Sequence, residues 1–469
     1  MRIAAMRMLL LLLLWPTLLS ASQDLRVGPG APFSTITEAL AVASPGDTIR
    51  VARGHYREQL VIERPVVLVG QEWPTIDGGG NGHVIEALAP ISISGFVIRS
   101  SGDDGDREDS GLMVRAGPSQ IVDNQFEDVL YGVYVKQAPG SLIAGNRVVG
   151  KPLALARRGD GIRLWYSAGT QVLDNDVHQA RDLVVYFSDS LSMRGNRVFD
   201  GRYGLHYMYS NHSTVEDNWL AGNQVGAFLM YSTHLQLRGN VFAGARGATG
   251  MGLGLKDADH VWVSNNLILK NAVGVHLDNS PRSANMPNEF RENAFAYNEM
   301  AVRLLPAVAN NHFVDNAFSA NGRPVGVAGG AREQVAQNEW ARNYWSEYVG
   351  FDEDGDGIGD TPFSHVRFSD ELLSRHPDLR FFSGSPALSM LDRAMRFFPL
   401  LRPIPMVVDS TPRLSALALD PWRASMTEQP VEISREDVAS GRWSVIVAAM
   451  TLGAMLLIWG VIADRGRDR

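Results

Sequence analysis

The sequence predicts an all-β protein, a right-handed parallel β-helix with about 22 residues per coil. The first observation is a repeat from residue 121 to residue 340, in which an apolar residue, two variable residues, an Asn and a second apolar residue recur. The second is a short alternating apolar run, often opened by Gly, eight residues after most of these Asn positions. A repeat of this period made of short alternating segments indicates stacked β-coils.

Stacked coils place equivalent residues in columns with a spacing of about 4.8 Å. Amide side chains in such a column hydrogen-bond to one another along the stack, so we expect the Asn column to line an inside corner. We therefore assign these asparagines a structural role and no site role. The column consists of Asn124, Asn146, Asn175, Asn196, Asn218, Asn240, Asn266, Asn293, Asn316 and Asn338.

The N-terminal segment is typical of an export signal. Arg2 and Arg7 precede an apolar run, and small residues follow up to Ser22. We expect residues 1–22 to be removed on export, which predicts a periplasmic protein. The chain has 0 cysteines, so a soft-metal site would have to use Met and His. The net charge of −8 excludes a basic surface for nucleic acid.

Residues 23–385 are predicted to form the β-helix domain. An exposed β-helix end leaves a row of unpaired backbone groups, so we expect a cover over the first coil. Ser34 with Thr37 and Glu38 resembles a helix start, which predicts an amphipathic cap helix over about residues 34–43.

The outward positions of the Gly-led strand carry the candidate docking surface. Four consecutive coils are predicted to place Trp165, Phe187, Met208 and Met230 in one column. His206 and Phe228, together with Val185, are predicted to stand beside that column. An exposed apolar patch usually marks a partner surface. The alternative is that the insertions at residues 151–158 and 246–250 cover this face.

Histidines form another predicted column in three consecutive coils, at His212, His234 and His260. Imidazole and thioether groups are ligands that suit Cu(I), so these residues are candidate copper ligands. The full set of candidates is His206, Met208, Met230, His212, His234 and His260. The alternative is a ladder of stacked histidines located in turns.

A different grouping of charged side chains favours an enzyme. Lys256, Asp257, Asp278 and Arg303 fall on neighbouring outward positions, and a polysaccharide lyase or epimerase needs such a combination of carboxylate and base. The alternative is a set of surface ion pairs. We therefore carry a polysaccharide-active enzyme as the second functional class.

An Asp-rich loop at residues 352–360 resembles a calcium loop. Asp352, Asp354, Asp356 and Asp360 occupy ligand positions, but Phe363 stands where the bidentate Glu is expected. We expect this loop to bind calcium and to fix the end of the stack.

The C-terminal part contains an amphipathic and Pro-rich tether at residues 386–443. Residues 444–463 are free of charge, which predicts a single transmembrane helix. The tail at residues 464–469 has three arginines and is predicted to be cytoplasmic. The expected location is thus the periplasm, with one C-terminal anchor in the inner membrane.

Several segments together resemble the NosD family. The segments are Phe33–Val51, Asp160–Tyr166, Arg202–Ser210, Asn343–Ser346 and Asp352–Asp360. The resemblance implies a periplasmic β-helix accessory protein for the maturation of nitrous oxide reductase, without catalysis of its own. It also implies as partners the ATPase and permease subunits of an ABC transporter, a copper chaperone and the reductase.

Overall fold

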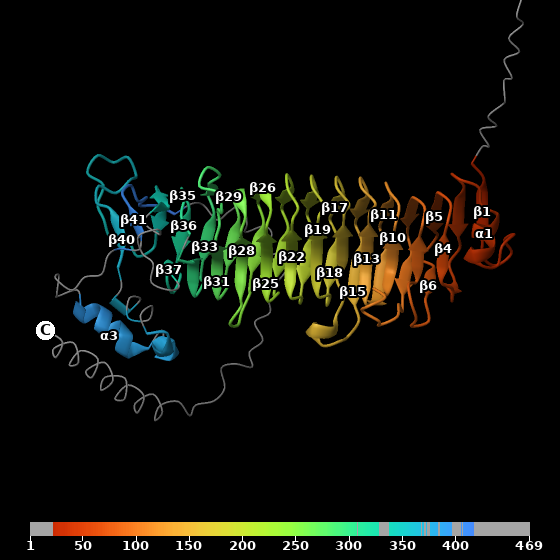
Figure 1. The fold of residues 1–469 in the computed structure, drawn as a ribbon, viewed down its shortest axis with the longest axis horizontal. Helices are drawn as coiled ribbons and strands as arrows, with labels where there is room; N and C mark the ends of the chain where they lie inside the picture. Colours follow the sequence, from red (N-terminus) through yellow and green to blue (C-terminus); the bar gives the residue numbers. More distant parts are fainter. Residues whose placement is uncertain are drawn as a thin grey trace, which may run out of the picture.

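The computed structural model shows one long stack of β-coils (Figure 1). The structure describes residues 22–306, 308–327, 337–366, 368–369, 372, 376–382, 385–395, 405 and 407–416. The predicted signal peptide lies, except for Ser22, outside these residues, as does the tail at residues 464–469. Each coil contributes one strand to each of three parallel sheets, so the right-handed parallel β-helix is confirmed.

Sheet A has 14 strands in the described residues and forms the first side of each coil. Its strands, in spatial order, are β1 (Asp24–Val27), β2 (Thr48–Val51), β5 (Val66–Gly70), β8 (Ile91–Ser94), β11 (Gln120–Val122), β14 (Leu142–Ala144), β17 (Gln171–Leu173), β20 (Ser192–Arg194), β23 (Thr214–Glu216), β26 (Thr233–Arg238), β29 (Asp259–Ser264), β32 (Asn288–Arg291), β35 (Asn311–Val314) and β38 (Glu339–Ala341).

Sheet B follows sheet A in each coil and has 13 described strands. They are β3 (His55–Tyr56), β6 (Thr75–Asp77), β9 (Val97–Arg99), β12 (Gln125–Val129), β15 (Arg147–Gly150), β18 (Asp176–His178), β21 (Arg197–Phe199), β24 (Trp219–Ala221), β27 (Val241–Ala243), β30 (Leu267–Leu269), β33 (Ala294–Ala296), β36 (Ala317–Ser319) and β39 (Tyr344–Trp345).

Sheet C completes the coil with 12 described strands. They are β4 (Leu60–Ile62), β7 (Ile85–Ala87), β10 (Ser110–Val114), β13 (Tyr131–Lys136), β16 (Ile162–Trp165), β19 (Asp182–Tyr186), β22 (Tyr203–Met208), β25 (Val225–Met230), β28 (Met251–Lys256), β31 (Val273–Asp278), β34 (Met300–Leu304) and β37 (Val325–Val327). A short 3₁₀ helix, η1 (Leu155–Arg157), lies in the insertion before β16.

The Asn column lines the corner between sheets A and B, and the member that follows Asn316 is Asn343. The prediction that Asn338 belongs to this column is wrong, because Asn338 accepts hydrogen bonds from Asn311 in a separate column at the start of the sheet A strands.

In a typical rung of the Asn column, the Asn218 side chain accepts hydrogen bonds from the backbone N–H and the amide of Asn196, both at 2.9 Å. It donates in turn to the Met193 carbonyl at 3.0 Å and to the Asn240 side chain at 2.9 Å. Each amide therefore satisfies backbone groups of its neighbours that the turn would otherwise leave unpaired.

Helix α1 (Ile36–Val42) covers the N-terminal end of the stack, inside the range expected for the cap helix (Figure 1). Thr35 and Glu38 form a capping box at its start. Glu58 from the first coils accepts hydrogen bonds from the backbone N–H groups of Ile36 and Thr37 at 3.0 and 2.8 Å. The buried face of α1, which includes Ile36 and Ala39, packs on the core.

The other end of the stack is closed by β40 (Phe363–His365) and β41 (Val407–Asp409), which pair antiparallel. Asp409 ends the Asn column, because its Oδ2 atom accepts hydrogen bonds from the Asn343 N–H, the Asn343 amide and the Trp345 indole at 2.9–3.1 Å. Among the described residues, η3 (Pro377–Phe382) and α3 (Pro386–Met395) lie between β40 and β41 in the chain.

The transmembrane part of the predicted fold class is corrected. In the described parts of the chain, no helix is both long and apolar enough to cross a membrane. The segment at residues 444–463 that suggested a span lies outside the described residues, as does most of the predicted tether.

Candidate functional site

The outer face of sheet C carries two parallel rows of outward side chains, one residue per coil in each row. The strand register gives the first row as Arg163, Val184, His206, Phe228, Gly254, His276 and Arg303. The second row is Trp165, Tyr186, Met208, Met230, Lys256 and Asp278. Together, the two rows carry charged residues at both ends. The middle of the two rows consists of imidazole, thioether and aromatic side chains, and we call it the soft face; its residues are His206, Met208, Phe228 and Met230.

The predicted placement of Phe187 and Val185 in this face is wrong by one residue. Trp165 pairs with Tyr186, and Val185 points inward and is fully buried. This coil has no Gly at the start of its strand, and a register shift lies between Asp182 and Val184. Counting from a Gly position therefore moved every side chain of β19 to the opposite face.

Phe187 belongs instead to an aromatic ladder at the corner between sheets C and A. The rings of Tyr166, Phe187, Tyr209 and Tyr231 stack face to face, with centroids 4.9, 5.2 and 4.9 Å apart. The first three are 51, 36 and 45% exposed. Because each ring covers the face of the next, the ladder presents ring edges to solvent. We did not predict it, although an aromatic residue directly after each of four successive strands was a visible signal.

Two buried carboxylates occupy the N-terminal part of this face. Arg181 donates two hydrogen bonds to Asp160 at 3.1 and 3.0 Å. On the next coil, the Arg202 Nε atom donates to Asp182 at 3.0 Å. Burial raises the pKa of Asp160 to about 6, although the positive charge of Arg181 opposes this shift. For Asp182, burial also acts to raise the pKa, but hydrogen bonds from His206 and Arg202 outweigh it and the pKa is lowered.

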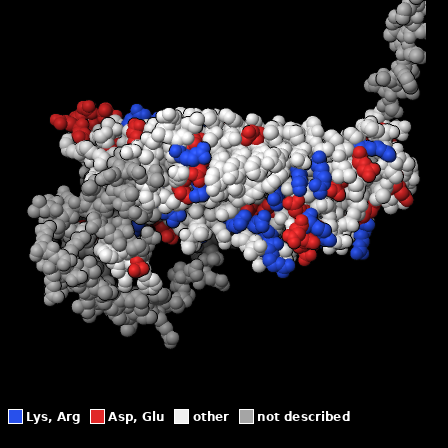
Figure 2. All heavy atoms as spheres, viewed as in Figure 1, with Lys and Arg blue, Asp and Glu red and all other residues white. Residues whose placement is uncertain are grey.

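Arg163 lies in a cage of aromatic rings beside these carboxylates. Its guanidinium carbon is 5.0–5.9 Å from the ring centroids of Tyr131, Tyr134, Trp165 and Tyr186. Glu108 reaches to within 3.8 Å of the guanidinium from the acidic loop at residues 101–110. This loop therefore contacts sheet C. Figure 2 shows that positive and negative side chains gather on the lower flank of the stack.

His206 stands where the charged part meets the soft part. Its Nδ1 atom is 3.4 Å from the Asp182 Oδ2 atom and 3.3 Å from the Tyr186 hydroxyl. Met208 lies on the same strand and face, and Met230 is its register partner on the next strand. The structure thus groups one imidazole and two thioethers on adjacent strands, a donor set that suits Cu(I).

The soft surface continues past Phe228 because Gly254 has no side chain. A Cβ atom at this glycine would lie 2.5 Å from the Phe228 ring and 2.8 Å from the Met251 sulfur. Both groups therefore fold over the same backbone position, and thioether contacts with aromatic rings are favourable. Val225 and Val273 pack with Met251 in this cluster.

His212, His234 and His260 form a ladder of their own at the same corner. Successive ring centroids are 4.7 Å apart, with interplanar angles of 28° and 52°. In the part of the chain that the structure describes, the only group of three His, Cys, Asp or Glu with mutually close ligand atoms is Asp352, Asp354 and Asp356. The three imidazoles therefore do not converge on one point, and the stacked-ladder interpretation fits this geometry.

The lyase-like grouping consists of paired charges. The Lys256 Nζ atom lies 2.7 Å from Asp278 and 3.9 Å from Asp257. The hydrogen bond to Asp278 raises the pKa of Lys256. A smaller fraction of the amine is then deprotonated at neutral pH and available as a general base. The Arg303 Nε atom donates to His276 Nδ1 at 3.0 Å. The ion-pair alternative therefore describes these contacts.

The predicted calcium loop is not supported. Asp352 accepts hydrogen bonds from the backbone N–H groups of Gly355 and Gly357 at 2.6 and 2.9 Å, and the loop's own amides thus stabilise the charged carboxylate and lower its pKa. Asp360 is not part of the close group formed by the other three carboxylates. Phe363 is buried against Trp345, with ring centroids 4.5 Å apart, and is thus a core residue.

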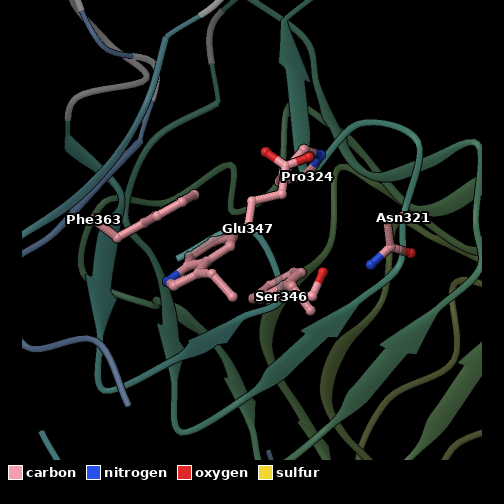
Figure 3. A pocket seen from close by; sticks show the side chains of 7 residues that line it. Asn321, Pro324, Ser346, Glu347 and Phe363 are labelled. Atoms are coloured by element: carbon pink, nitrogen blue, oxygen red, sulfur yellow. The ribbon is translucent and has the colours of Figure 1, made fainter. Parts of the chain in front are cut away.

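A small hollow lies at the C-terminal end of the stack (Figure 3). Its lining residues are Phe318, Asn321, Pro324, Trp345, Ser346, Glu347 and Phe363. Trp345 stacks on Phe318 on one side and on Phe363 on the other. The hollow thus belongs to the closing coils and is separate from the sheet C face.

Two protein-family models match parts of this chain. Residues 144–350 match the family described as periplasmic copper-binding protein NosD, and residues 25–85 match a family of unknown function. The matched segment 144–350 contains both rows of the soft face. Solved structures that are similar include a mannuronan C-5 epimerase module from Azotobacter vinelandii, at 13% identity and a TM-score of 0.44, covering 62% of this chain and 89% of that one. These values carry no information on activity.

Two curated relatives are both named probable ABC transporter binding protein NosD. The one from Pseudomonas aeruginosa is 28% identical over 456 residues, which cover 84% of this chain and 97% of the relative. The one from Stutzerimonas stutzeri is 28% identical over 413 residues, covering 77% of this chain and 86% of the relative. The chain is therefore similar to NosD-type proteins both in its central coils and along most of its length.

Proposed function

We propose that this protein is a non-catalytic periplasmic accessory protein for the maturation of nitrous oxide reductase. It docks the partners of an ABC transporter system on the outer face of sheet C and hands Cu(I) from one partner to the next. The observation that carries the proposal is the meeting of soft ligands and an exposed aromatic ladder on the same coils. Met208 and Met230 directly precede Tyr209 and Tyr231 in the chain, and His206 lies on the same strand as Met208.

The docking surface consists of the soft face and the aromatic ladder. Interface cores are enriched in aromatic residues and Met and depleted in charge, and both columns have this composition. Trp165 joins the two columns, because its ring packs edge-on against Tyr166, Tyr186 and Phe187 with centroids 5.4–5.7 Å apart. The partners proposed for this surface are the copper chaperone, the reductase, and the permease and ATPase subunits of the transporter.

Replacement of Trp165, Phe187 and Met230 with Ser tests the docking surface. Buried aromatic side chains at interfaces often contribute more than about 1.4 kcal/mol each, so we expect affinity for the chaperone or the reductase to fall at least about tenfold. Affinity is measured with the purified partners, and copurification from native membranes identifies which partners are lost.

The matched control replaces two exposed aromatic residues elsewhere, Trp262 and Tyr297, with Ser. They are 43 and 63% exposed and lie outside the soft face. We expect this variant to bind partners as wild type does. Equal binding by the triple variant and wild type would show that the docking surface lies elsewhere.

Copper transfer is tested separately from docking. The donor set of His206, Met208 and Met230 is open to the outside, because both thioethers are half-buried and not enclosed. Competition with a chromophoric Cu(I) chelator should reveal one stoichiometric site in the purified protein. The Met208→Leu/Met230→Leu variant keeps the side-chain volume and removes both sulfur ligands, so we expect it to lose this site.

Met286→Leu is the control for copper binding, because this methionine is 38% exposed and lies next to the histidine ladder at His260. We expect it to retain wild-type competition. If wild type fails to compete at any chelator ratio, the protein does not carry copper and only the docking role remains.

A further inference from the structure

The first row of sheet C contains two histidines in opposite surroundings. His206 on β22 and His276 on β31 are 7 and 9% exposed and occupy equivalent positions three coils apart, with Phe228 and Gly254 between them. A neutral imidazole can offer a lone pair to a metal only from the nitrogen that carries no proton. The contacts of each ring therefore decide which nitrogen is available.

The surroundings of His206 favour a proton on Nδ1. Its Nδ1 atom faces the Asp182 Oδ2 atom at 3.4 Å. Arg202 and the Tyr203 N–H both donate to the Asp182 carboxylate, which is the environment of an ionised group. An ionised carboxylate can only accept, so a lone pair on Nδ1 would face a negative charge, whereas an Nδ1–H group would donate to it. The Tyr186 oxygen at 3.3 Å is able to accept from the same group.

The surroundings of His276 favour the other tautomer. The Arg303 Nε atom donates to His276 Nδ1 at 3.0 Å. A guanidinium has no acceptor, so His276 Nδ1 must hold its lone pair toward Arg303, and the proton resides on Nε2. His276 is thereby blocked as a ligand through Nε2, while the same atom of His206 is available.

We propose that Asp182 is a positioning residue that holds His206 in the Nδ1–H tautomer, so that Nε2 is the imidazole ligand beside Met208 and Met230. This inference rests on the copper part of the proposed function. Metal-binding histidines commonly donate their second ring N–H to a carboxylate, which fixes the tautomer and raises the basicity of the ligand atom. The Asp182–His206 contact has this form.

The Asp182→Asn substitution tests the role of the carboxylate. The Oδ1 atom of Asp182 receives the Arg202 Nε and Tyr203 N–H groups at 3.0 and 3.2 Å. The Oδ2 atom also receives the Arg202 Nη2 group. The NH₂ group of an Asn therefore meets two opposing donors at the Oδ1 position and only one at the Oδ2 position, so the carbonyl oxygen takes the Oδ1 position. The NH₂ group then faces His206 and turns Nδ1 into an acceptor. We therefore expect the variant to move the His206 proton from Nδ1 to Nε2.

Nitrogen NMR of the metal-free full chain, labelled with ¹⁵N-histidine, reports the tautomer directly. The His206 signals are assigned by their loss in His206→Gln. We expect an Nδ1–H signal pattern in wild type and an Nε2–H pattern in Asp182→Asn. The Asp160→Asn variant is the matched control, because Asp160 is also buried and paired with an arginine but on the neighbouring coil. It should leave the His206 signals in place.

Cu(I) competition supplies the second measurement. Loss of an outer-shell partner commonly lowers metal affinity 10–100-fold, and we expect a loss of about this size in Asp182→Asn but not in Asp160→Asn. An Nε2–H pattern for His206 in metal-free wild type overturns this inference, whatever the copper result. Unchanged Cu(I) affinity in Asp182→Asn overturns it as well. An absence of Cu(I) binding in wild type overturns the proposed copper transfer, and the ligand role of His206 with it.

Discussion

The inside corner between sheets A and B and the outer face of sheet C are built in opposite ways. The corner repeats one residue from Asn124 to Asn343, with the same hydrogen bonds in each rung, and ends at Asp409. The outer face changes its residue type along both rows, except at the adjacent Met208 and Met230. A column that repeats one side chain supplies the same hydrogen bonds to backbone groups in each coil. A column whose residues vary is not needed for such hydrogen bonds. Its composition therefore reports on contacts outside the coil.

Breaking one rung in the middle of the Asn column should have the largest effect on stability. In Asn218→Leu, the Asn196 N–H and amide groups and the Met193 carbonyl lose the partners that they have at 2.9–3.0 Å. Buried groups without partners cost about 1–3 kcal/mol each, so we expect the free energy of unfolding to fall by about 4 kcal/mol. Urea titration measures this loss.

The exposed Asn285 provides the control for this substitution. Asn285→Leu should change the free energy of unfolding by less than about 0.5 kcal/mol. An equally small loss in Asn218→Leu would mean that the amide column contributes little beyond filling space, and the contrast between corner and face would then fail.

The buried carboxylate of Asp160 should give the next largest effect, one that depends on pH. Its pKa is about 6 in the folded protein against 3.8 in the unfolded chain, so the folded state binds more protons between these values. Stability from this group therefore rises as the pH falls from 8 toward 4. At about 1.4 kcal/mol per unit, a shift of about 2 units amounts to about 3 kcal/mol.

Asp160→Asn removes this titration, and the measurement is the difference in unfolding free energy between wild type and variant from pH 8 to pH 5. We expect the unfolding free energy of wild type to rise relative to that of the variant as the pH falls. A difference that stays constant across this range would show that Arg181 keeps the carboxylate ionised throughout.

The repeating parts of the molecule could be predicted from the sequence, because the same pattern of residues recurs in many coils. The inward columns, the Asn column up to Asn316 and the presence of the cap helix need only local spacing. The start of that helix was predicted at Ser34, one residue before the observed N-cap Thr35. The face of sheet C could not be predicted in the same way. Its contacts join residues of different coils, such as Asp160 with Arg181, and therefore depend on the register. The register could not be counted through β19, where the coil is shortened and shifted.

The same shift explains why the candidate site was only partly anticipated. His206, Met208, Phe228 and Met230 lie in coils with a Gly landmark, and the structure places them on the outer face as expected. Tyr186 and Asp182 were missed as neighbours of His206, because the one-residue error put Val185 and Phe187 in their row. The aromatic ladder was missed because its residues sit in turns at positive φ, between 49 and 51°, outside the strand pattern.

Substitutions at Val185 in β19 and at Phe187 in the turn that follows compare an inward core residue with a residue of the aromatic ladder. Val185 points into the core and is fully buried, so Val185→Ala should lower the unfolding free energy by about 1–2 kcal/mol. Phe187 is 36% exposed and contacts Tyr166 and Tyr209 only through stacking, so Phe187→Ala should cost less than about 1 kcal/mol. Partner affinity should show the reverse order, because only Phe187 belongs to the docking surface. If Phe187→Ala is the more destabilising of the two and leaves partner binding unchanged, the ladder serves the fold, and the outer corner follows the same rule as the inner one.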